Sequence, residues 1–239
     1  MTDSDPLARL AALEGVASAA AATRDGIDAM LRDRGLRRTT PDLTAESLLR
    51  GAHASAVLEG SDSPLDAVRV DGGDPTAQAA LRVSTELLGL VPVLARTPLQ
   101  AVARIHTLAA KGVVDHVDLG RPRDAVAAAR LHDLGGTLSA RTTAPALVVA
   151  AVAHAEIASV APFVSHNGIV ARAVERLLLV ARGVDPTSLT VPEAGHLALR
   201  REYESNLRGY AQGGAAGVHG WLLYALEAYA AGAEASPLR

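Results

Sequence analysis

The chain has 239 residues, a formal net charge of −3 at pH 7 and no cysteine. This charge excludes a general attraction for nucleic acid, and the lack of cysteine excludes disulfides and cysteine-ligated metal sites. The acidic N-terminus lacks the order of a secretory signal, and the most apolar window contains His154 and Glu156, so we predict a cytoplasmic protein with no membrane partner.

Alanine and leucine dominate the sequence and aromatic residues make up only 3%, a composition that favours helices. Asp5-Pro6, Asp74-Pro75 and Thr97-Pro98 each place a capping side chain before a proline at the first helical position. These signals and the apolar spacing predict helices at residues 6–34, 44–60, 75–89, 98–111, 124–134, 144–160, 170–182, 192–210 and 218–232.

The connections between these helices are short. Residues 61–73 are rich in Asp, Ser, Gly and Pro, which predicts a surface loop. Val113, Val114 and Val117 predict a short strand in an otherwise helical chain. The sequence contains no internal repeat, and the overall pattern predicts an all-α helical bundle.

A short loop between the helices expected at 144–160 and 170–182 ends in Asn167-Gly168 at a helix start. The first N–H groups of a helix lack partners within it and lie at the positive end of its dipole, so they favour an anion. Arg172 follows one turn later, where its guanidinium can reach the same anion. Two interpretations stay open: a phosphate site, or an Asn167 that simply caps the helix.

The segment resembles the motif of Fic (Fido-fold) proteins, His-Pro-Phe-x-Asp/Glu-Gly-Asn-Gly-Arg-x-x-Arg, aligned without a gap. The matching residues are Pro162, Phe163, Asn167, Gly168 and Arg172. The resemblance implies a Fic/Fido-like helical bundle in which the Asn-Gly loop and the arginine hold the phosphates of a nucleotide.

The departures from that motif fall on its chemistry. Ala161 stands where the family has its catalytic His, Ser165 replaces the metal-binding acid, His166 the first Gly, and Ile169 the first Arg. In Fic proteins the His is the base that activates a target hydroxyl for transfer of AMP from ATP, and the acid holds Mg²⁺. The segment therefore resembles a degenerate Fic motif.

The resemblance covers roughly residues 44–232, so we expect a helical extension at 1–43 and a Fic-like domain at 44–239, together one compact unit. Ser55, Glu59 and Gly60 match the family's inhibitory-helix pattern, Ser/Thr-x-x-x-Glu-Gly/Asn. The resemblance implies an ion pair between Glu59 and Arg172 that obstructs nucleotide binding. The same pair could instead only tie an N-terminal helix to the core.

Other positions matching the family lie outside the motif. Residues 120–123 stand where the target-docking flap normally begins, but the short alanine-rich sequence after them implies a reduced flap. His154 matches a histidine that is often a packed scaffold residue in the family. The remaining histidine positions are weak metal candidates, and we predict no metal site: His106, Asp115-His116 and His132-Asp133.

The lost residues set the expected function. Alanine cannot accept a proton, and general-base assistance is worth roughly 10²–10⁴-fold in rate. Serine is a poor ligand for Mg²⁺, which prefers anionic oxygen. We therefore expect a Fic-fold pseudoenzyme that binds ATP or another nucleotide, with no strong need for Mg²⁺. The binding residues we predict are Phe163, His166, Asn167, Gly168 and Arg172.

Two alternatives remain open beside a pseudoenzyme that binds a nucleotide or a protein partner. The first is an active nucleotidyl- or phospho-group transferase in which His166, or a group on the substrate, replaces the missing base. The second is a purely structural antitoxin-like or scaffold subunit. A homo-oligomer is compatible with all three.

Overall fold

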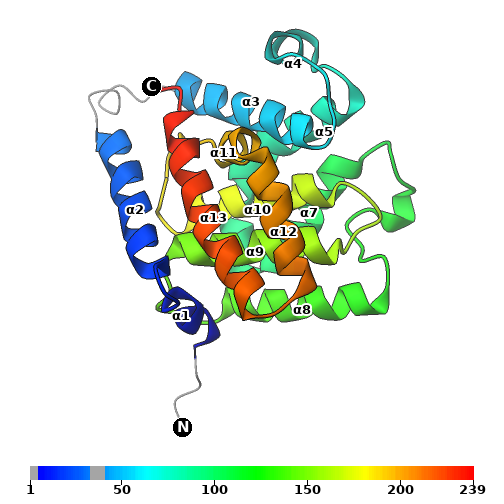
Figure 1. The fold of residues 1–239 in the computed structure, drawn as a ribbon. Helices are drawn as coiled ribbons and strands as arrows, with labels where there is room; N and C mark the ends of the chain where they lie inside the picture. The colour runs from blue at the N-terminus through cyan, green and yellow to red at the C-terminus, as the bar shows by residue number, and fades with distance from the viewer. Residues whose placement is uncertain (1–4, 33–40) are drawn as a thin grey trace.

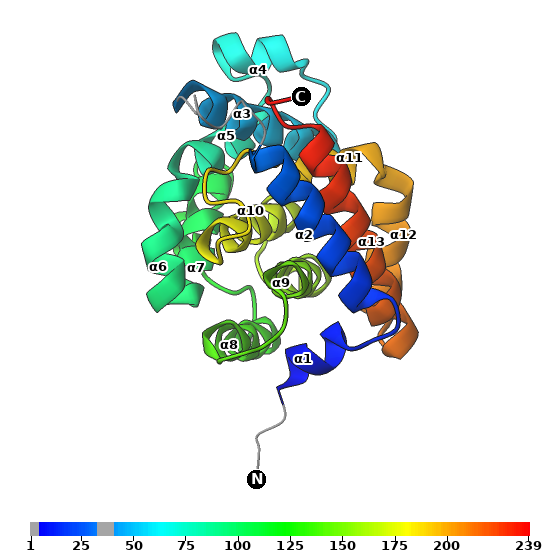
Figure 2. The same cartoon turned by 90° about the vertical axis from the view of Figure 1, so that its left-hand side faces the viewer.

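The computed structural model describes residues 5–32 and 41–239, and this part of the chain forms helices and no strand. Helices α9 (Ala146–Val160) and α10 (Asn167–Ala181) pack against each other at the centre, and the other helices surround them (Figures 1 and 2). α9 is buried along nearly its whole length. The all-α bundle predicted from the sequence is confirmed.

The N-terminal half of the chain covers one end and one side of the central pair. Its elements are α1 (Pro6–Ala11), α2 (Val16–Arg32), α3 (Pro41–Leu58), α4 (Leu65–Asp71), α5 (Pro75–Leu87), the 3-10 turn η2 (Leu88–Leu90) and α6 (Val91–Arg96). α3 packs on α5, while α1 packs on α9 and α2 on α13. The N-terminal helices are thus packed onto the bundle (Figure 2).

The C-terminal half completes the layer around α9 and α10. Its elements are α7 (Pro98–Ala110), the 3-10 turn η3 (His116–Asp118), α8 (Ala125–Ser139), α11 (Pro192–Ala198), α12 (Arg200–Gln212) and α13 (Ala215–Glu234). α13 contacts both α11 and α12. Trp221 of α13 is fully buried and its indole N–H donates to Ala151 O of α9 at 2.8 Å, which joins the last helix to the centre.

The cap-and-proline signals hold at two of the three positions. The Asp5 carboxylate accepts from Ala8 N at 3.1 Å, and the Asp74 carboxylate accepts from Ala77 N at 2.9 Å. Thr97 does not cap α7, because its hydroxyl donates back to Val93 O at 3.2 Å. The prediction of a cap at Thr97 is therefore wrong, although α7 begins at the following proline as expected.

The first predicted helix is in fact two, because the chain breaks at Gly15, whose φ of 75° lies in the left-handed region. Its predicted end, at Arg34 and Gly35, lies outside the described residues. α3 begins at Pro41 instead of Thr44, and proline is well suited to that first position. The expected surface loop at 61–73 contains α4.

Later boundaries also differ. The helix expected at 75–89 continues through η2 into α6, because Pro92 falls in the first turn of α6, where its missing N–H costs nothing. The predicted strand is wrong: Val113 and Val117 are exposed and pair with no strand in the described chain. α8 runs on to Ser139, and the helix expected at 192–210 breaks at Leu199.

Residues 75–96 form one helical stretch that is long and apolar enough, by length and composition, to cross a membrane. In the fold this stretch comprises α5, η2 and α6. α5 packs on α3 and α7, and α6 packs on α7 and α10. Packing inside the bundle therefore accounts for its apolar residues, whereas the cytoplasmic location stays a prediction.

Candidate functional site

The loop between the two central helices is held by the side chain of Asn167. Its Oδ1 accepts from Phe163 N and its Nδ2 donates to Phe163 O, both at 2.9 Å. The loop begins and ends at residues in the left-handed conformation, Ala161 with a φ of 46° and His166 with a φ of 57°. Asn167 thus closes the loop, and the alternative that it caps α10 is wrong.

No side chain caps the start of α10 in this structure. His166 occupies the capping position, but its side chain makes no hydrogen bond to the first turn. The first intrahelical bond runs from Val170 N to His166 O at 3.0 Å. The earlier amides of the first turn lie at the positive end of the helix dipole, which is the arrangement that attracts an anion.

The carboxylate of Glu59 lies against this helix start. A Cβ atom on residue 168 would collide with Glu59 Oε1, so the glycine is what allows the carboxylate to approach. Glu59 follows the end of α3 and its side chain is 32% exposed. The same Oε1 atom accepts from Arg172 Nη2 at 2.7 Å, which establishes the ion pair predicted from the sequence.

Arg172 is held in place by neutral partners as well. Its side chain is 1% exposed, and its Nε and Nη2 atoms donate to the hydroxyl and carbonyl oxygens of Ser55 at 2.9 and 3.1 Å. Nη1 donates to the Tyr203 hydroxyl at 3.2 Å. Because these contacts do not involve Glu59, the guanidinium would keep its position if the carboxylate moved away.

His166 and Ser165 meet beside the helix start. The His166 Nδ1 atom lies 2.7 Å from Ser165 Oγ. Burial lowers the pKa of His166, with the Glu59 charge acting in the opposite sense, so the imidazole is neutral at pH 7. The side chain nearest to the Cα of Gly168 is that of Glu59, followed by that of Arg172.

The other predicted site residues shape the surroundings. Phe163 is buried and stacks on His106, with ring centroids 4.1 Å apart and an interplanar angle of 6°. Gly60 has a φ of 92°, which lets the chain turn directly after Glu59. Where the resemblance implied a reduced flap, Arg123 N donates to Pro162 O at 2.8 Å, and α8 follows without a hairpin.

The donor set at the motif does not fit Mg²⁺. Ser165 offers a neutral hydroxyl that already contacts His166. The nearby carboxylate of Glu59 is bound to Arg172, so its charge is compensated. Mg²⁺ requires anionic oxygen ligands, and the motif positions supply none.

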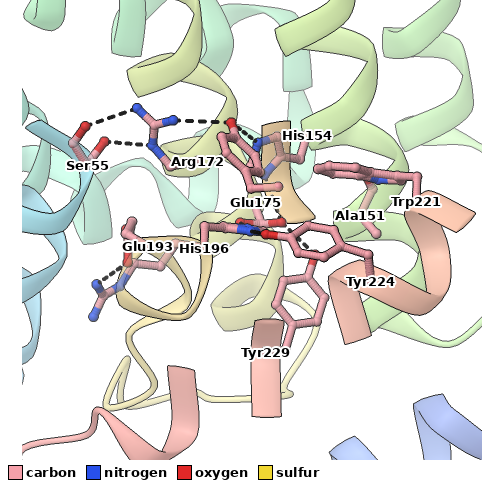
Figure 3. Close-up of polar contacts among 12 residues, drawn as sticks. Ser55, Ala151, His154, Arg172, Glu175, Glu193, His196, Trp221, Tyr224 and Tyr229 are labelled. Carbon is pink, nitrogen blue, oxygen red and sulfur yellow. Dashed lines mark hydrogen bonds and ion pairs between the residues drawn. The ribbon is translucent and has the colours of Figure 1, made fainter. Parts of the chain in front are cut away.

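A second group of buried polar residues lies deeper along α10, and of its members the sequence predicted only His154, as a packed scaffold residue. The Glu175 carboxylate contacts His154 of α9 and His196 of α11, and all three side chains are fully buried (Figure 3). Nearby, Arg176 Nη1 pairs with Glu193 Oε2 at 3.0 Å. The available signal was the placement of charged residues on the apolar face of a helix, where each needs a partner.

Comparison with known proteins supports the fold. A Fic family protein from Desulfovibrio desulfuricans G20 has a TM-score of 0.73 at 20% identity, over 91% of this chain and 74% of the other. Fic-1 from C. elegans has a TM-score of 0.70 at 17% identity, over 92% and 71%. Its variant with one glutamate replaced by glycine has a TM-score of 0.66 at 18% identity, over 90% and 69%. No protein-family model and no curated protein matches the sequence.

Proposed function

We propose that this chain, which has the all-α fold of Fic proteins, binds the phosphates of a nucleotide at the start of α10 and does not transfer AMP. The observation that carries the proposal is the position of Glu59. Its carboxylate lies on the Cα of Gly168 and on the guanidinium of Arg172. A protein anion thus occupies the place that suits a phosphate.

The same geometry argues against ordinary AMP transfer. Ala161 carries a methyl group where a base would have to accept the proton of the target hydroxyl. Ser165 supplies no negative charge for Mg²⁺. Phosphate binding needs neither residue, because the amides of α10 and the guanidinium of Arg172 suffice for an anion.

The Glu59 carboxylate would compete with a phosphate for the guanidinium of Arg172. The side chain of Glu59 is partly exposed, so water can solvate the carboxylate when it leaves the buried guanidinium. Arg172 stays anchored by Ser55 and Tyr203. A nucleotide would therefore bind weakly to the native chain and more tightly once the carboxylate is removed.

The test is calorimetric titration of ATP, with and without Mg²⁺, into the native chain and the Glu59→Ala variant. Glu46→Ala is the matched control, since Glu46 lies on the preceding helix α3 and pairs with Arg50 and Arg69 far from the motif. We expect the Glu59 variant to bind ATP at least about tenfold more tightly, a gain of about 1.4 kcal/mol, with Glu46→Ala unchanged. No ATP binding by the Glu59 variant would refute a nucleotide site.

The transferase alternative is favoured by one contact, that of His166 Nδ1 with Ser165 Oγ at 2.7 Å. A neutral imidazole at that distance can accept a hydroxyl proton. Incubation with labelled ATP separates the two functions. Label appearing on the chain or on an added protein, and lost in His166→Ala, would support transfer. Binding of ATP without label supports the pseudoenzyme. If the chain neither binds ATP nor acquires label, the structural subunit is the remaining function.

A further inference from the structure

Three metal-ligating side chains from three helices meet in the core. His154 comes from α9, Glu175 from α10 and His196 from α11, and each is fully buried (Figure 3). Their ligand atoms lie within 4.8 Å of one another. His154 Nδ1 is 2.9 Å from Glu175 Oε1, and His196 Nε2 is 2.9 Å from Glu175 Oε2. The inner nitrogens of both rings therefore face one carboxylate.

Tyrosine hydroxyls hold the outer side of each of these three groups. The Tyr203 hydroxyl lies 3.0 Å from His154 Nε2, and the Tyr224 hydroxyl lies 2.7 Å from His196 Nδ1. The Tyr229 hydroxyl donates to Glu175 Oε1 at 2.6 Å. In metal sites, a ligating imidazole usually has its other nitrogen hydrogen-bonded, which fixes the ring orientation and the tautomer. The three tyrosines supply this arrangement.

One buried nitrogen of this cluster has no well-aligned hydrogen-bond partner. His154 Nδ1 makes no hydrogen bond, although it lies close to Glu175 Oε1, because the contact is off the direction that a hydrogen bond needs. A bare nitrogen lone pair facing a carboxylate oxygen at 2.9 Å would be repulsive, so a proton on Nδ1 or a cation has to lie between the two atoms. Either a proton or a metal ion could satisfy both atoms.

We propose that His154, Glu175 and His196 bind a divalent transition-metal ion, for which zinc is the probe. Two imidazoles and one carboxylate are a donor set that suits zinc and similar ions. Two atoms that bind one ion at about 2.1 Å lie at most about 4.2 Å apart. The present spread of 4.8 Å would have to contract by about half an ångström, which side-chain rotation can supply.

Such an ion would be structural. The cluster is sealed from solvent, so the ion would enter as the chain folds and would join α9, α10 and α11. It would lie deeper along α10 than the helix start where the nucleotide is proposed to bind, with Tyr203 in contact with both Arg172 and His154. The two proposals use different ligands, and zinc content and ATP titration test them separately.

The test uses the full chain, freed of any histidine tag and refolded from denaturant with zinc or with chelator. We expect about one tightly bound zinc per chain by elemental analysis. We also expect the zinc-refolded protein to melt about 5–10 °C higher than the chelator-refolded protein. Refolding with Co²⁺ should give the visible absorption of a four- or five-coordinate site, a readout that needs no variant.

Variants then locate the ion. His196→Gln should retain less than one tenth of the native zinc, whereas His106→Gln, which replaces a fully buried histidine outside the cluster, should retain it all. Tyr224→Phe keeps all three ligands and should weaken zinc binding about 10–100-fold. Native protein refolded in zinc that holds no metal and melts unchanged would overturn the proposal, and so would zinc retained in His196→Gln.

Discussion

The two halves of α10 hold their charges in different ways. At its start, Arg172 pairs with a carboxylate that is 32% exposed and belongs to a distant segment. One turn further, Glu175 and Arg176 pair with side chains that are at most 5% exposed. Water can replace the first partner and cannot reach the second. The outer half is therefore suited to exchanging ligands, and the inner half to holding helices together.

The largest effect should come from breaking the inner half. Glu193→Ala would leave the Arg176 guanidinium buried without a carboxylate, although Ser47 and Ser188 would still contact it. We expect a loss of about 3–5 kcal/mol in the free energy of unfolding, measured by urea denaturation. Glu46→Ala, which removes a carboxylate that pairs with arginines at the surface, should lower the free energy of unfolding by less than about 1 kcal/mol. If Glu193→Ala and Glu46→Ala lost the same free energy of unfolding, burial would not distinguish the two ion pairs.

Protonation of His106, which stacks on Phe163 of the motif loop, should make the fold less stable in acid. Burial lowers the pKa of His106 to about 4 in the folded chain, from an ordinary value of 6.5. Between pH 6.5 and 4 the unfolded chain binds the extra proton, so stability falls as the pH falls. By pH 4 the free energy of unfolding should have fallen by about 3 kcal/mol.

Urea unfolding at pH 7 and pH 4.5 checks this expectation. His106→Gln should show a smaller loss of stability between the two pH values than the native chain, because glutamine does not titrate. His219→Gln, at a partly exposed histidine, is the control. If His106→Gln and the native chain lose the same free energy, His106 does not cause the acid sensitivity.

Tyr203 joins the two halves, since its hydroxyl contacts both Arg172 and His154. Tyr203→Phe would leave one donor on the guanidinium without its buried partner. We expect a loss of about 1–3 kcal/mol in the free energy of unfolding, measured by urea denaturation. Tyr210→Phe, which removes a hydroxyl bonded to Glu156 at the surface, should lose less. If Tyr203→Phe lost less free energy of unfolding than Tyr210→Phe, Tyr203 would not join the two halves of α10.

Of the three substitutions at partners of Arg172 and Arg176, Glu59→Ala should have the smallest effect on stability, a loss of about 1 kcal/mol in the free energy of unfolding. Arg172 is buried, but it keeps its hydrogen bonds to Ser55 and Tyr203 in this variant. Thermal unfolding at low salt measures the change. A loss as large as that of Glu193→Ala would show that Glu59 serves structure and does not guard a ligand site.

In the outer half, the sequence predicted the ion pair of Glu59 with Arg172, whereas in the inner half it predicted only that His154 is packed in the scaffold. Local spacing was enough to group Asn167, Gly168 and Arg172, because they lie within one loop and one helical turn. The partnership of Glu59 and Arg172 came from a resemblance to a family motif. His154, Glu175 and His196 lie on three helices, and no local pattern states that these helices meet. Their contact depends on packing, which only the fold reveals.

The same limit explains the errors in the fold. Capping residues and prolines located the starts of several helices, because these signals act within a few residues. The break at Leu199 and the helical turn within 61–73 depend on how neighbouring helices pack, so propensity alone missed them. The predicted strand at 113–117 failed for a related reason: a strand needs a partner, and this bundle offers none in its described part.

The central claim is that the amides at the start of α10 accept a phosphate once Glu59 is withdrawn. The most direct measurement follows the amide resonance of Gly168 by NMR while ATP is added to the Glu59→Ala variant. We predict a saturable shift that disappears when Arg172→Ala is added to that variant. A Gly168 resonance that stays unmoved at saturating ATP, while other amides shift, would contradict the account.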